Sequence, residues 1–228
     1  MNLEKLENNL GVKFKNKDLL VQAMTHRSYL NENPEFHLDH NERLEFLGDA
    51  VLELVVTEYL YKNYKNPEGD LTSWRASLVN SKMLAIIGTK LEINDSLLLS
   101  RGEAKDFGRA RQYIITNAVE SVIGAIYLDQ GYDVTSNFIE RFILSELNDI
   151  IENKLNKDAK SLFQELAQEK VNVTPVYKVL REWGPDHDRS FSVGVFLNDE
   201  MAGEGDGRSK QEAQQSAAEN ALKNKDWN

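Results

Sequence analysis

The chain contains no cysteine among its 228 residues. Disulfide bonds, thiolate nucleophiles and cysteine-based zinc or iron–sulfur sites are therefore excluded, so any metal must be held by oxygen atoms or by the four histidines. His26, His37, His40 and His187 are scattered and lack the spacing of a metal-ligand set. Hard cations that prefer oxygen ligands become the first candidates.

Long hydrophobic runs are also missing. No stretch approaches the roughly 18–20 apolar residues of a membrane span, and the opening MNLEKLENNL is charged where a secretory signal would be apolar. With 41% hydrophobic and 28% charged residues and only 4 prolines, the composition excludes a fibrous or fully disordered chain. We expect a cytoplasmic protein with no membrane partner.

Positive charge is scarce, because 27 Lys and Arg face 37 Asp and Glu, which gives a formal net charge of −10. Residues 1–157 hold 18 basic against 24 acidic side chains, and residues 158–228 hold 9 against 13. Taken alone, this balance argues against a nucleic-acid partner, since non-specific binding is driven by neutralising phosphates.

The spacing of apolar residues divides the chain into two parts. Up to about residue 150, apolar residues recur every three or four positions, as between Leu44 and Val56, which predicts helices and little strand. The polar stretch from Asn148 to Ala159 predicts a linker. We expect domains at residues 1–150 and 158–226, joined by a linker at residues 151–157.

The second part predicts a helix, three strands and a final helix. The expected elements are a helix at 160–168 and strands at 176–183, 191–197 and 200–203. A turn at 205–209 then precedes a helix that begins with an S-x-x-E capping box formed by Ser209 and Glu212. The expected fold class is an all-α domain followed by a small α+β domain of the order α-β-β-β-α.

The segment NERLEFLGDAVL carries three carboxylates on one helical stripe. Glu42, Glu45 and Asp49 are spaced i, i+3 and i+7, which places them within about 60° of one another around a helix. A solvated face is the ordinary explanation of such a stripe. Apolar neighbours on both sides instead predict partly buried carboxylates, which need a compensating positive charge.

A second apolar segment, IITNAVESVIGAI, has Glu120 as its single charged residue, with Asn117 one turn earlier on the same face. An isolated ionised carboxylate in an apolar helix is costly unless it is paired or bound to metal. If the two helices pack together, their oxygen atoms form a pocket suited to Mg²⁺. The alternative is a structural ion pair between Glu120 and Arg43 or another base.

The two acidic segments and their flanking residues together resemble a known protein family. The run NERLEFLGDAVL, with Thr25-His26-Arg27-Ser28 upstream and Glu68-Gly69-Asp70-Leu71 and Ala118-Val119-Glu120-Ser121 downstream, closely resembles the endonuclease domain of bacterial ribonuclease III. The second part of the chain resembles a double-stranded-RNA-binding domain, so the resemblance covers nearly the whole chain. It implies an all-helical nuclease domain that forms a homodimer.

The resemblance also assigns roles to the acidic residues. Glu45, Asp49 and Glu120 match metal-binding carboxylates of the family, with Asp49 and Glu120 as the catalytic pair. Glu42 and Glu68 match acidic positions that support the site or contact RNA and the neighbouring subunit. Asn117 departs from the pattern, because Asp is commoner there. An amide still offers a neutral oxygen to the metal, and we expect a higher Mg²⁺ requirement.

The implied reaction is hydrolysis of phosphodiester bonds in double-stranded RNA, with Mg²⁺ or, in its place, Mn²⁺ as the cofactor and with no organic cofactor. The expected products carry 5′-phosphate and 3′-hydroxyl ends, and rRNA and mRNA precursors are the expected substrates. Phe46 is expected at the dimer interface, although on its own it is also consistent with a core aromatic residue.

The resemblance places RNA contacts in the second domain, at Gln164, at His187 and at Arg208, Ser209 and Lys210. Taken locally, residues 205–209 are also consistent with a plain turn and helix cap. A basic loop in the nuclease domain adds candidate contacts, although it is equally consistent with a solvated loop; its basic residues are Arg101, Lys105, Arg109 and Arg111.

Two other functions compete with the nuclease. One is an RNA-binding scaffold that has lost cleavage through Asn117, but the retention of Glu45, Asp49 and Glu120 argues against it. The other is a purely structural helical protein, which leaves the carboxylates in two apolar helices unexplained.

Overall fold

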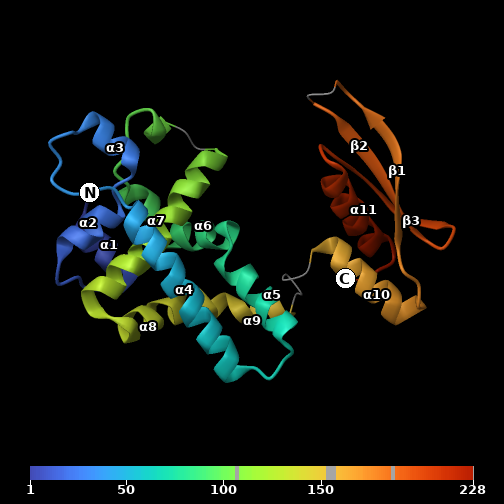
Figure 1. Ribbon diagram of the computed structural model, residues 1–228, viewed down its shortest axis with the longest axis horizontal. Helices are drawn as coiled ribbons and strands as arrows, with labels where there is room; N and C mark the ends of the chain where they lie inside the picture. The colour runs from blue at the N-terminus through green and yellow to red at the C-terminus, as the bar shows by residue number, and fades with distance from the viewer. Residues whose placement is uncertain (106–107, 153–157, 186–187, 228) are drawn as a thin grey trace. The chain divides into compact units, whose positions relative to one another are not determined.

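The computed structural model describes residues 1–105, 108–152, 158–185 and 188–227 (Figure 1). The chain divides into two compact units, Met1–Asn156 and Lys157–Asn228, and each unit has its own hydrophobic core. The expected fold class, an all-α unit followed by an α-β-β-β-α unit, is confirmed. Residues 153–157 of the expected linker lie outside the described part of the chain.

The described residues of the first unit form helices joined by short connections. The α-helices are α1 Leu3–Leu10, α2 Lys17–Ala23, α3 Arg27–Glu32, α4 Glu42–Asn63, α5 Glu68–Val79, α6 Ser81–Lys90, α7 Arg109–Gln130, α8 Tyr132–Phe142 and α9 Leu147–Glu152. The 3-10 turns are η1 Ile93–Ser96, η2 Glu103–Lys105 and η3 Leu144–Glu146. Within the described residues, no helix is both long and apolar enough to cross a membrane.

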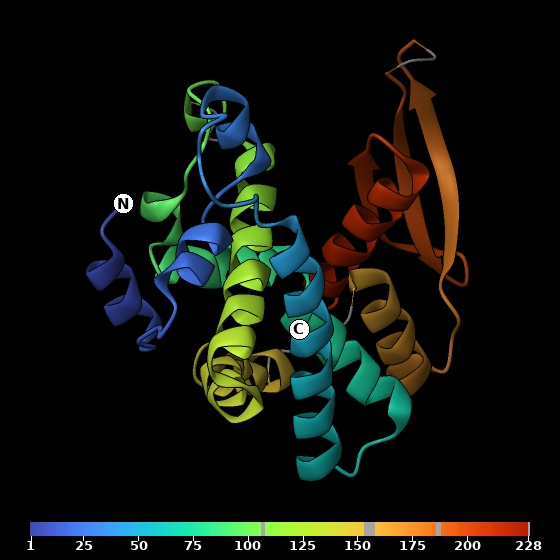
Figure 2. The same ribbon diagram turned by 60° about the vertical axis from the view of Figure 1, so that its left-hand side comes forward.

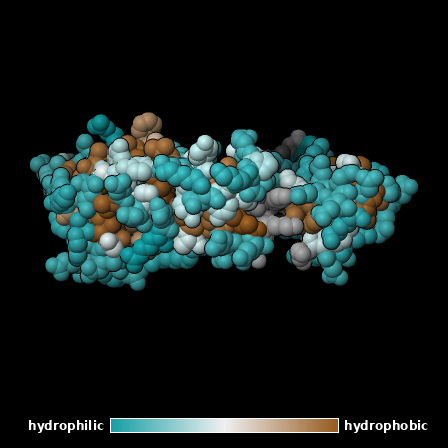
Figure 3. Space-filling view, turned by 90° about the horizontal axis from the view of Figure 1, so that it is seen from below, coloured by the Kyte–Doolittle hydropathy of each residue, from teal (hydrophilic) through white to brown (hydrophobic). Residues whose placement is uncertain are grey.

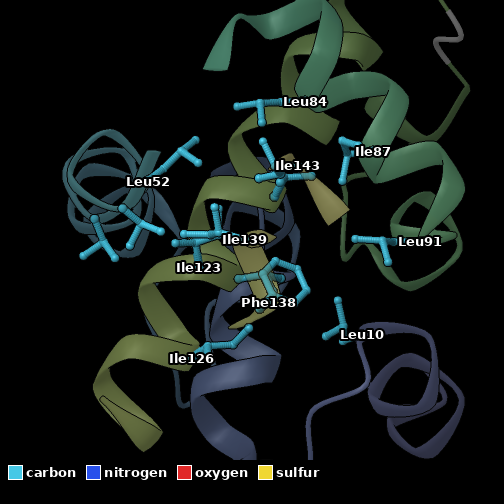
Figure 4. Close-up of a cluster of buried hydrophobic side chains, with 14 of the residues drawn as sticks. Leu10, Leu52, Leu84, Ile87, Leu91, Ile123, Ile126, Phe138, Ile139 and Ile143 are labelled. Atoms are coloured by element: carbon cyan, nitrogen blue, oxygen red, sulfur yellow. The ribbon is translucent and has the colours of Figure 1, made fainter. Parts of the chain in front are cut away.

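Helix α7 forms the centre of the first unit. Ile123 and Ile126 of this helix are fully buried, in a cluster that also contains side chains from α4, α6 and α8 (Figure 4). A helix that is apolar on several faces is stable only when other elements cover it. Figures 1 and 2 both show the two longest helices, α4 and α7, side by side.

The second unit packs two helices against one face of a three-stranded sheet. Its elements are α10 Ala159–Val171, β1 Val176–Trp183, β2 Ser190–Leu197, β3 Glu200–Gly207 and α11 Lys210–Asn224. The strands are antiparallel in the order β1-β2-β3, with Tyr177 opposite Val195 and Val195 opposite Gly203. Asp158 begins α10 by accepting a hydrogen bond from the Ser161 amide at 2.9 Å.

Strand β3 is longer than the sequence predicts, because the glycines assigned to a turn belong to the strand. Gly205 and Gly207 face α11, and a Cβ atom on Gly205 would lie 2.2 Å from the backbone nitrogen of Ala217. Glycine is required where a strand and a helix backbone approach this closely. The Ser209 half of the predicted capping box is confirmed, since the Ser209 hydroxyl accepts a hydrogen bond from the Glu212 amide at 3.1 Å, whereas the Glu212 carboxylate accepts from the amide of Arg208 and not from that of Ser209.

The surface is largely hydrophilic on the face drawn in Figure 3, where hydrophobic residues appear as separate patches. Single exposed apolar residues are ordinary on a protein surface. Helix α4, in contrast, exposes a group of apolar side chains, which are Phe46, Leu54 and Tyr61.

Candidate functional site

Helices α4 and α7 cross at two glycines. A Cβ atom on Gly48 of α4 would lie 1.7 Å from the carbonyl oxygen of Glu120, and one on Gly124 of α7 would lie 2.3 Å from the carbonyl oxygen of Leu44. No other residue type fits at either position without moving a backbone. The two helix backbones therefore touch, and the turns on either side of the crossing face each other.

This crossing brings together side chains that are far apart in the sequence. Glu45 and Asp49 lie on α4, and Asn117 and Glu120 lie on α7. Glu45, Asn117 and Glu120 are half-buried, whereas Asp49 is exposed, contrary to the expectation that its apolar neighbours would partly bury it. Leu44, Val51 and Leu52 turn toward the core, and Asp49 lies on a different side of the helix.

The electrostatics of the cluster are strained by like charges. Burial and the neighbouring carboxylates of Asp49 and Glu45 raise the pKa of Glu120 to about 7. Burial and Glu42 raise the pKa of Glu45, while a side-chain hydrogen bond with Asn117 opposes the rise. The cluster therefore favours any cation that reaches it.

The alternative explanation of Glu120 as half of a structural ion pair is not supported. Arg43 is exposed, and within the described ranges no ion pair joins it or another basic residue to Glu120. At the start of α4, Arg27 lies beside Glu42 instead, 3.5 Å from its carboxylate, and the His40 ring lies 3.8 Å from the same carboxylate. Glu42 is thus beside the cluster but already paired.

The oxygen donors fit a hydrated hard cation. In the part of the chain that the structure describes, no three His, Cys, Asp or Glu side chains converge closely enough to hold an ion directly. Mg²⁺ does not need such a cage, because it keeps several waters and binds proteins through one or two carboxylates. Glu45, Asp49 and Glu120 supply carboxylate oxygens, and Asn117 adds an amide oxygen.

Glu68 does not join the cluster within one chain. It begins α5 and accepts a hydrogen bond from Thr72, in a surface pocket that it shares with Thr57 and Tyr61 of α4. Thr57 follows Glu45 by twelve residues, which corresponds to about 18 Å along a helix. A role for Glu68 at this site requires that a second copy of the chain bring it there.

One face of α4 exposes apolar side chains to solvent. Phe46 is 81% exposed, Leu54 56% and Tyr61 76%. Their spacing puts them on a single helical stripe. A surface pocket lies beside Phe46 and is lined in part by Leu19, Leu47 and Leu128. The interpretation of Phe46 as a core aromatic residue of a single chain is wrong.

The candidate RNA contacts of the second unit lie on its surface. Gln164 is exposed on α10, and Arg208, Ser209 and Lys210 are exposed at the start of α11. The Lys210 ammonium lies 5.6 Å from the centre of the Phe191 ring, a cation–π contact that orders this side chain. His187 lies outside the described residues.

The basic loop of the first unit is smaller than the sequence predicts. Arg101 and Lys105 are exposed, but Arg111 is only 7% exposed and donates a hydrogen bond to the Ala104 carbonyl at 3.1 Å. Arg111 lies on the first turn of α7, where it holds the loop rather than facing solvent. The Arg109 side chain lies outside the described part of the chain.

The two glycines that make the site were not among the residues predicted from the sequence. Gly48 and Gly124 stand inside apolar helical segments, where glycine costs about 1 kcal/mol relative to alanine. A glycine kept at such a cost signals close backbone approach. That signal was present in the sequence and could have predicted the crossing of α4 and α7.

Comparisons with known proteins match both units of the chain to described families. Residues 16–147 match the family model described as Ribonuclease-III-like, and residues 159–225 match the double-stranded RNA binding motif. The chain is 42% identical over 222 residues to Ribonuclease 3 of Pelotomaculum thermopropionicum, a match that covers 97% of this chain and 92% of that protein. It is 45% identical over 214 residues to Ribonuclease 3 of Natranaerobius thermophilus, with 93% and 92% covered.

A solved structure extends the match to three dimensions. The nuclease domain of ribonuclease III from Campylobacter jejuni is 44% identical, has a TM-score of 0.57, and covers 63% of this chain and 97% of that domain. The sequence matches extend over nearly the whole chain, and the structural match falls on the part that contains the carboxylate cluster. The chain belongs to the ribonuclease III family and is an endonuclease of the ribonuclease III type.

Proposed function

We propose that the protein is a Mg²⁺-dependent endoribonuclease that hydrolyses double-stranded RNA and leaves 5′-phosphate and 3′-hydroxyl ends. In this proposal it processes rRNA and mRNA precursors in the cytoplasm. The observation that carries the proposal is the carboxylate cluster formed by Glu45, Asp49 and Glu120 across the α4–α7 crossing. Mn²⁺ would replace Mg²⁺, because both accept oxygen ligands.

The metal requirement follows from the charges of the cluster. Nucleases of this family depend on divalent metal ions, and the donor set here consists of oxygen atoms alone. When bound, a divalent ion supplies an activated water and neutralises charge on the leaving oxygen. Burial and the Asp49 and Glu45 carboxylates raise the pKa of Glu120, so a bound cation would favour the ionised form of this carboxyl group.

Asn117 changes the Mg²⁺ requirement of the site without abolishing cleavage. Its side-chain amide lies close enough to Glu45 to oppose the rise that burial causes in the pKa of that carboxylate. The amide brings no charge, so the cluster has one negative charge fewer than a site with Asp at this position. We therefore propose that cleavage persists and needs more Mg²⁺ for a half-maximal rate.

The exposed stripe on α4 supports a homodimer. Phe46, Leu54 and Tyr61 present large apolar side chains on one stripe of α4, and a single copy leaves them in water. A two-fold pairing of this stripe buries the same residues from both copies and provides one site for each strand of a duplex. The Campylobacter jejuni nuclease domain is itself described as having a region involved in dimer formation.

The C-terminal unit supports engagement of the duplex. A double-stranded helix of RNA is recognised through phosphates and 2′-hydroxyl groups at fixed spacing. A protein surface that binds it needs polar side chains and only a few basic ones. Gln164 and the start of α11 offer such groups at the surface. Because residues 158–228 carry more acidic than basic side chains, we expect modest affinity from one module and higher avidity from two.

The test is cleavage of a long, end-labelled RNA duplex, compared with the single strand and a DNA duplex of the same sequence. Metal-dependent cutting of the RNA duplex alone, into fragments that are substrates for a 5′-phosphate-dependent exonuclease, is the expected result. Binding without cutting at high Mg²⁺ or with Mn²⁺ would instead identify an RNA-binding scaffold. Asn117→Asp would then be the variant expected to restore cleavage.

A further inference from the structure

Asn41 directly precedes α4, the helix that carries Glu42, Glu45 and Asp49, and it is 2% exposed. Asparagine at this position ordinarily caps the helix with its side-chain oxygen. Here the Asn41 side chain makes no capping hydrogen bond. The amide of Glu42 instead points to Nδ1 of His40, at 3.4 Å. The Asn41 side chain is therefore available for another role.

The Asn41 side chain ties the start of α4 to a neighbouring segment. Its Nδ2 donates a hydrogen bond to the carbonyl of Ala23, at the end of α2, at 3.2 Å. Its backbone nitrogen donates to the carbonyl of Thr25 at 2.9 Å. The side chain and the backbone of this buried residue each make one such bond. Together they fix the start of α4, because breaking either bond leaves a buried polar group without a partner.

The carbonyl group of Asn41 links the two helices of the site. It accepts hydrogen bonds from the amides of Leu44 and Glu45, each at 2.9 Å, and lies 3.2 Å from the hydroxyl of Ser121. Ser121 is fully buried, directly follows Glu120, and also lies 2.7 Å from the carbonyl of Asn117. The single hydroxyl proton of Ser121 is thus shared between the Asn117 carbonyl of α7 and the main-chain carbonyl of Asn41 at the start of α4, which links the two turns that carry the cluster.

We propose that Asn41 is a positioning residue for the metal site, an inference that rests on the proposed function. Asn41 and Ser121 hold the carboxylate-bearing turns of α4 and α7 at a fixed separation and rotation. Neither residue contacts the metal or the RNA. Groups that orient metal ligands in this way commonly change metal affinity by about 10–100-fold when they are removed.

Asn41→Asp is the sharpest variant. Aspartate has the same shape and caps helices as well as asparagine does, so a simple capping role predicts no loss. When ionised it cannot donate to the Ala23 carbonyl, so the tether is lost. The added negative charge alone would strengthen cation binding. A fall in metal affinity therefore cannot be explained by the added charge and points to the lost tether.

Two further variants complete the design. Ser121→Ala removes the hydrogen bond from the Ser121 hydroxyl to the Asn41 carbonyl and leaves the bond to Ala23 intact. The same loss of metal affinity is expected for Ser121→Ala, and this variant replaces Asn41→Asp if Asn41→Asp does not melt cooperatively. Thr135→Val is the matched control, because Thr135 is fully buried on α8 and its hydroxyl donates to the Gly131 carbonyl at 2.8 Å. Its loss costs a buried hydrogen bond away from the cluster.

The measurements are Mn²⁺ binding by electron paramagnetic resonance, the Mg²⁺ concentration for half-maximal cleavage, kcat, KM for the RNA duplex and the melting temperature. For Asn41→Asp and Ser121→Ala we expect Mn²⁺ affinity to fall about tenfold or more, with a matching rise in the Mg²⁺ requirement, a lower kcat and an unchanged KM. For Thr135→Val we expect a lower melting temperature with wild-type metal binding.

The outcomes separate this inference from the proposed function. Wild-type protein that binds Mn²⁺ and cuts RNA, with both site variants binding Mn²⁺ as tightly as the wild type, overturns the positioning role alone. An equal loss of Mn²⁺ affinity in Thr135→Val also overturns it, since the effect would then be general destabilisation. Wild-type protein that neither binds Mn²⁺ nor cuts overturns the proposed function, and the positioning role with it.

Discussion

Replacing Glu120 by glutamine is expected to stabilise the metal-free protein while abolishing cleavage. Burial and the Asp49 and Glu45 carboxylates raise the pKa of Glu120 from an ordinary value of 4.5 to about 7. A raised pKa means that the folded state loses stability as the pH rises from about 4.5 to about 7, because Glu120 must then ionise in an unfavourable place. Glutamine has the same shape and no charge, so it removes this loss.

The size of the effect follows from the same pKa. The difference between 4.5 and about 7 corresponds to about 3 kcal/mol, which solvent screening at this half-buried site reduces to about 1–2 kcal/mol. We expect Glu120→Gln to raise the free energy of unfolding by that amount at pH 8 in a chelating buffer. At pH 4.5 the two proteins should be nearly equal. Urea denaturation at both pH values measures the difference.

Glu7→Gln is the control of opposite sign. Glu7 is 2% exposed and accepts hydrogen bonds from the Phe14 amide, at 2.7 Å, and from Lys17. Burial raises the pKa of Glu7, but the hydrogen bonds from Lys17 and Phe14 outweigh burial and hold it below its ordinary value of 4.5. A lowered pKa stabilises the fold above pH 4.5, and this stabilisation is lost on further acidification. Glu7→Gln should therefore cost about 1–2 kcal/mol at pH 8.

The comparison is decisive because both changes replace a glutamate by glutamine. If Glu120→Gln is no more stable than the wild type at pH 8, the carboxylates of α4 and α7 do not repel each other as the structure indicates. A stability gap between Glu120→Gln and the wild type that does not change with pH would refute the same reasoning, because only ionisation makes the effect depend on pH.

Four other expectations follow from the structure. Gly124→Ala should lower the free energy of unfolding by about 2 kcal/mol and the cleavage rate by about 100-fold or more, because the added Cβ would lie 2.3 Å from the Leu44 carbonyl. Gly69→Ala is the control in both assays, because the space around Gly69 is open. Asn117→Asp should lower the Mg²⁺ concentration for half-maximal cleavage, and an unchanged or higher requirement would count against the proposed role of the amide. Phe46→Ala should shift sedimentation equilibrium toward monomer. Duplex binding should weaken with salt along a shallow log–log slope, whereas a steep slope would mean that more phosphates are contacted.

Periodicity in the sequence predicted most of the fold, because local spacing reports which face of an element is buried. The strand Val176–Trp183 and the cap at Ser209 are local features, and both are confirmed. The predicted end of β3 was wrong for a non-local reason. Glycines that resemble a turn in the sequence are needed in the strand because the backbone of α11 passes directly over them.

The sequence predicted the members of the carboxylate cluster better than their surroundings. Carboxylates in apolar segments pointed to Glu45 and Glu120, but the exposure of Asp49 depends on how α4 is rotated about its axis, which the sequence does not state. Arg111 belongs to a basic run in the sequence and yet is buried, because α7 begins at Arg109 and turns it inward. The unusual role of Asn41 is visible only when Ala23 and Ser121 are placed beside it.

Single-turnover cleavage of an RNA duplex, with the wild type and Glu120→Gln compared across a range of Mg²⁺ concentrations, tests the central claim most directly. We predict that wild-type cleavage rises with Mg²⁺ to a plateau and is absent in a chelating buffer. We also predict that Glu120→Gln binds the duplex with wild-type affinity and does not cut it. Cutting by Glu120→Gln at the wild-type rate, or wild-type cutting without a divalent ion, would contradict the assignment of the α4–α7 cluster as the metal site.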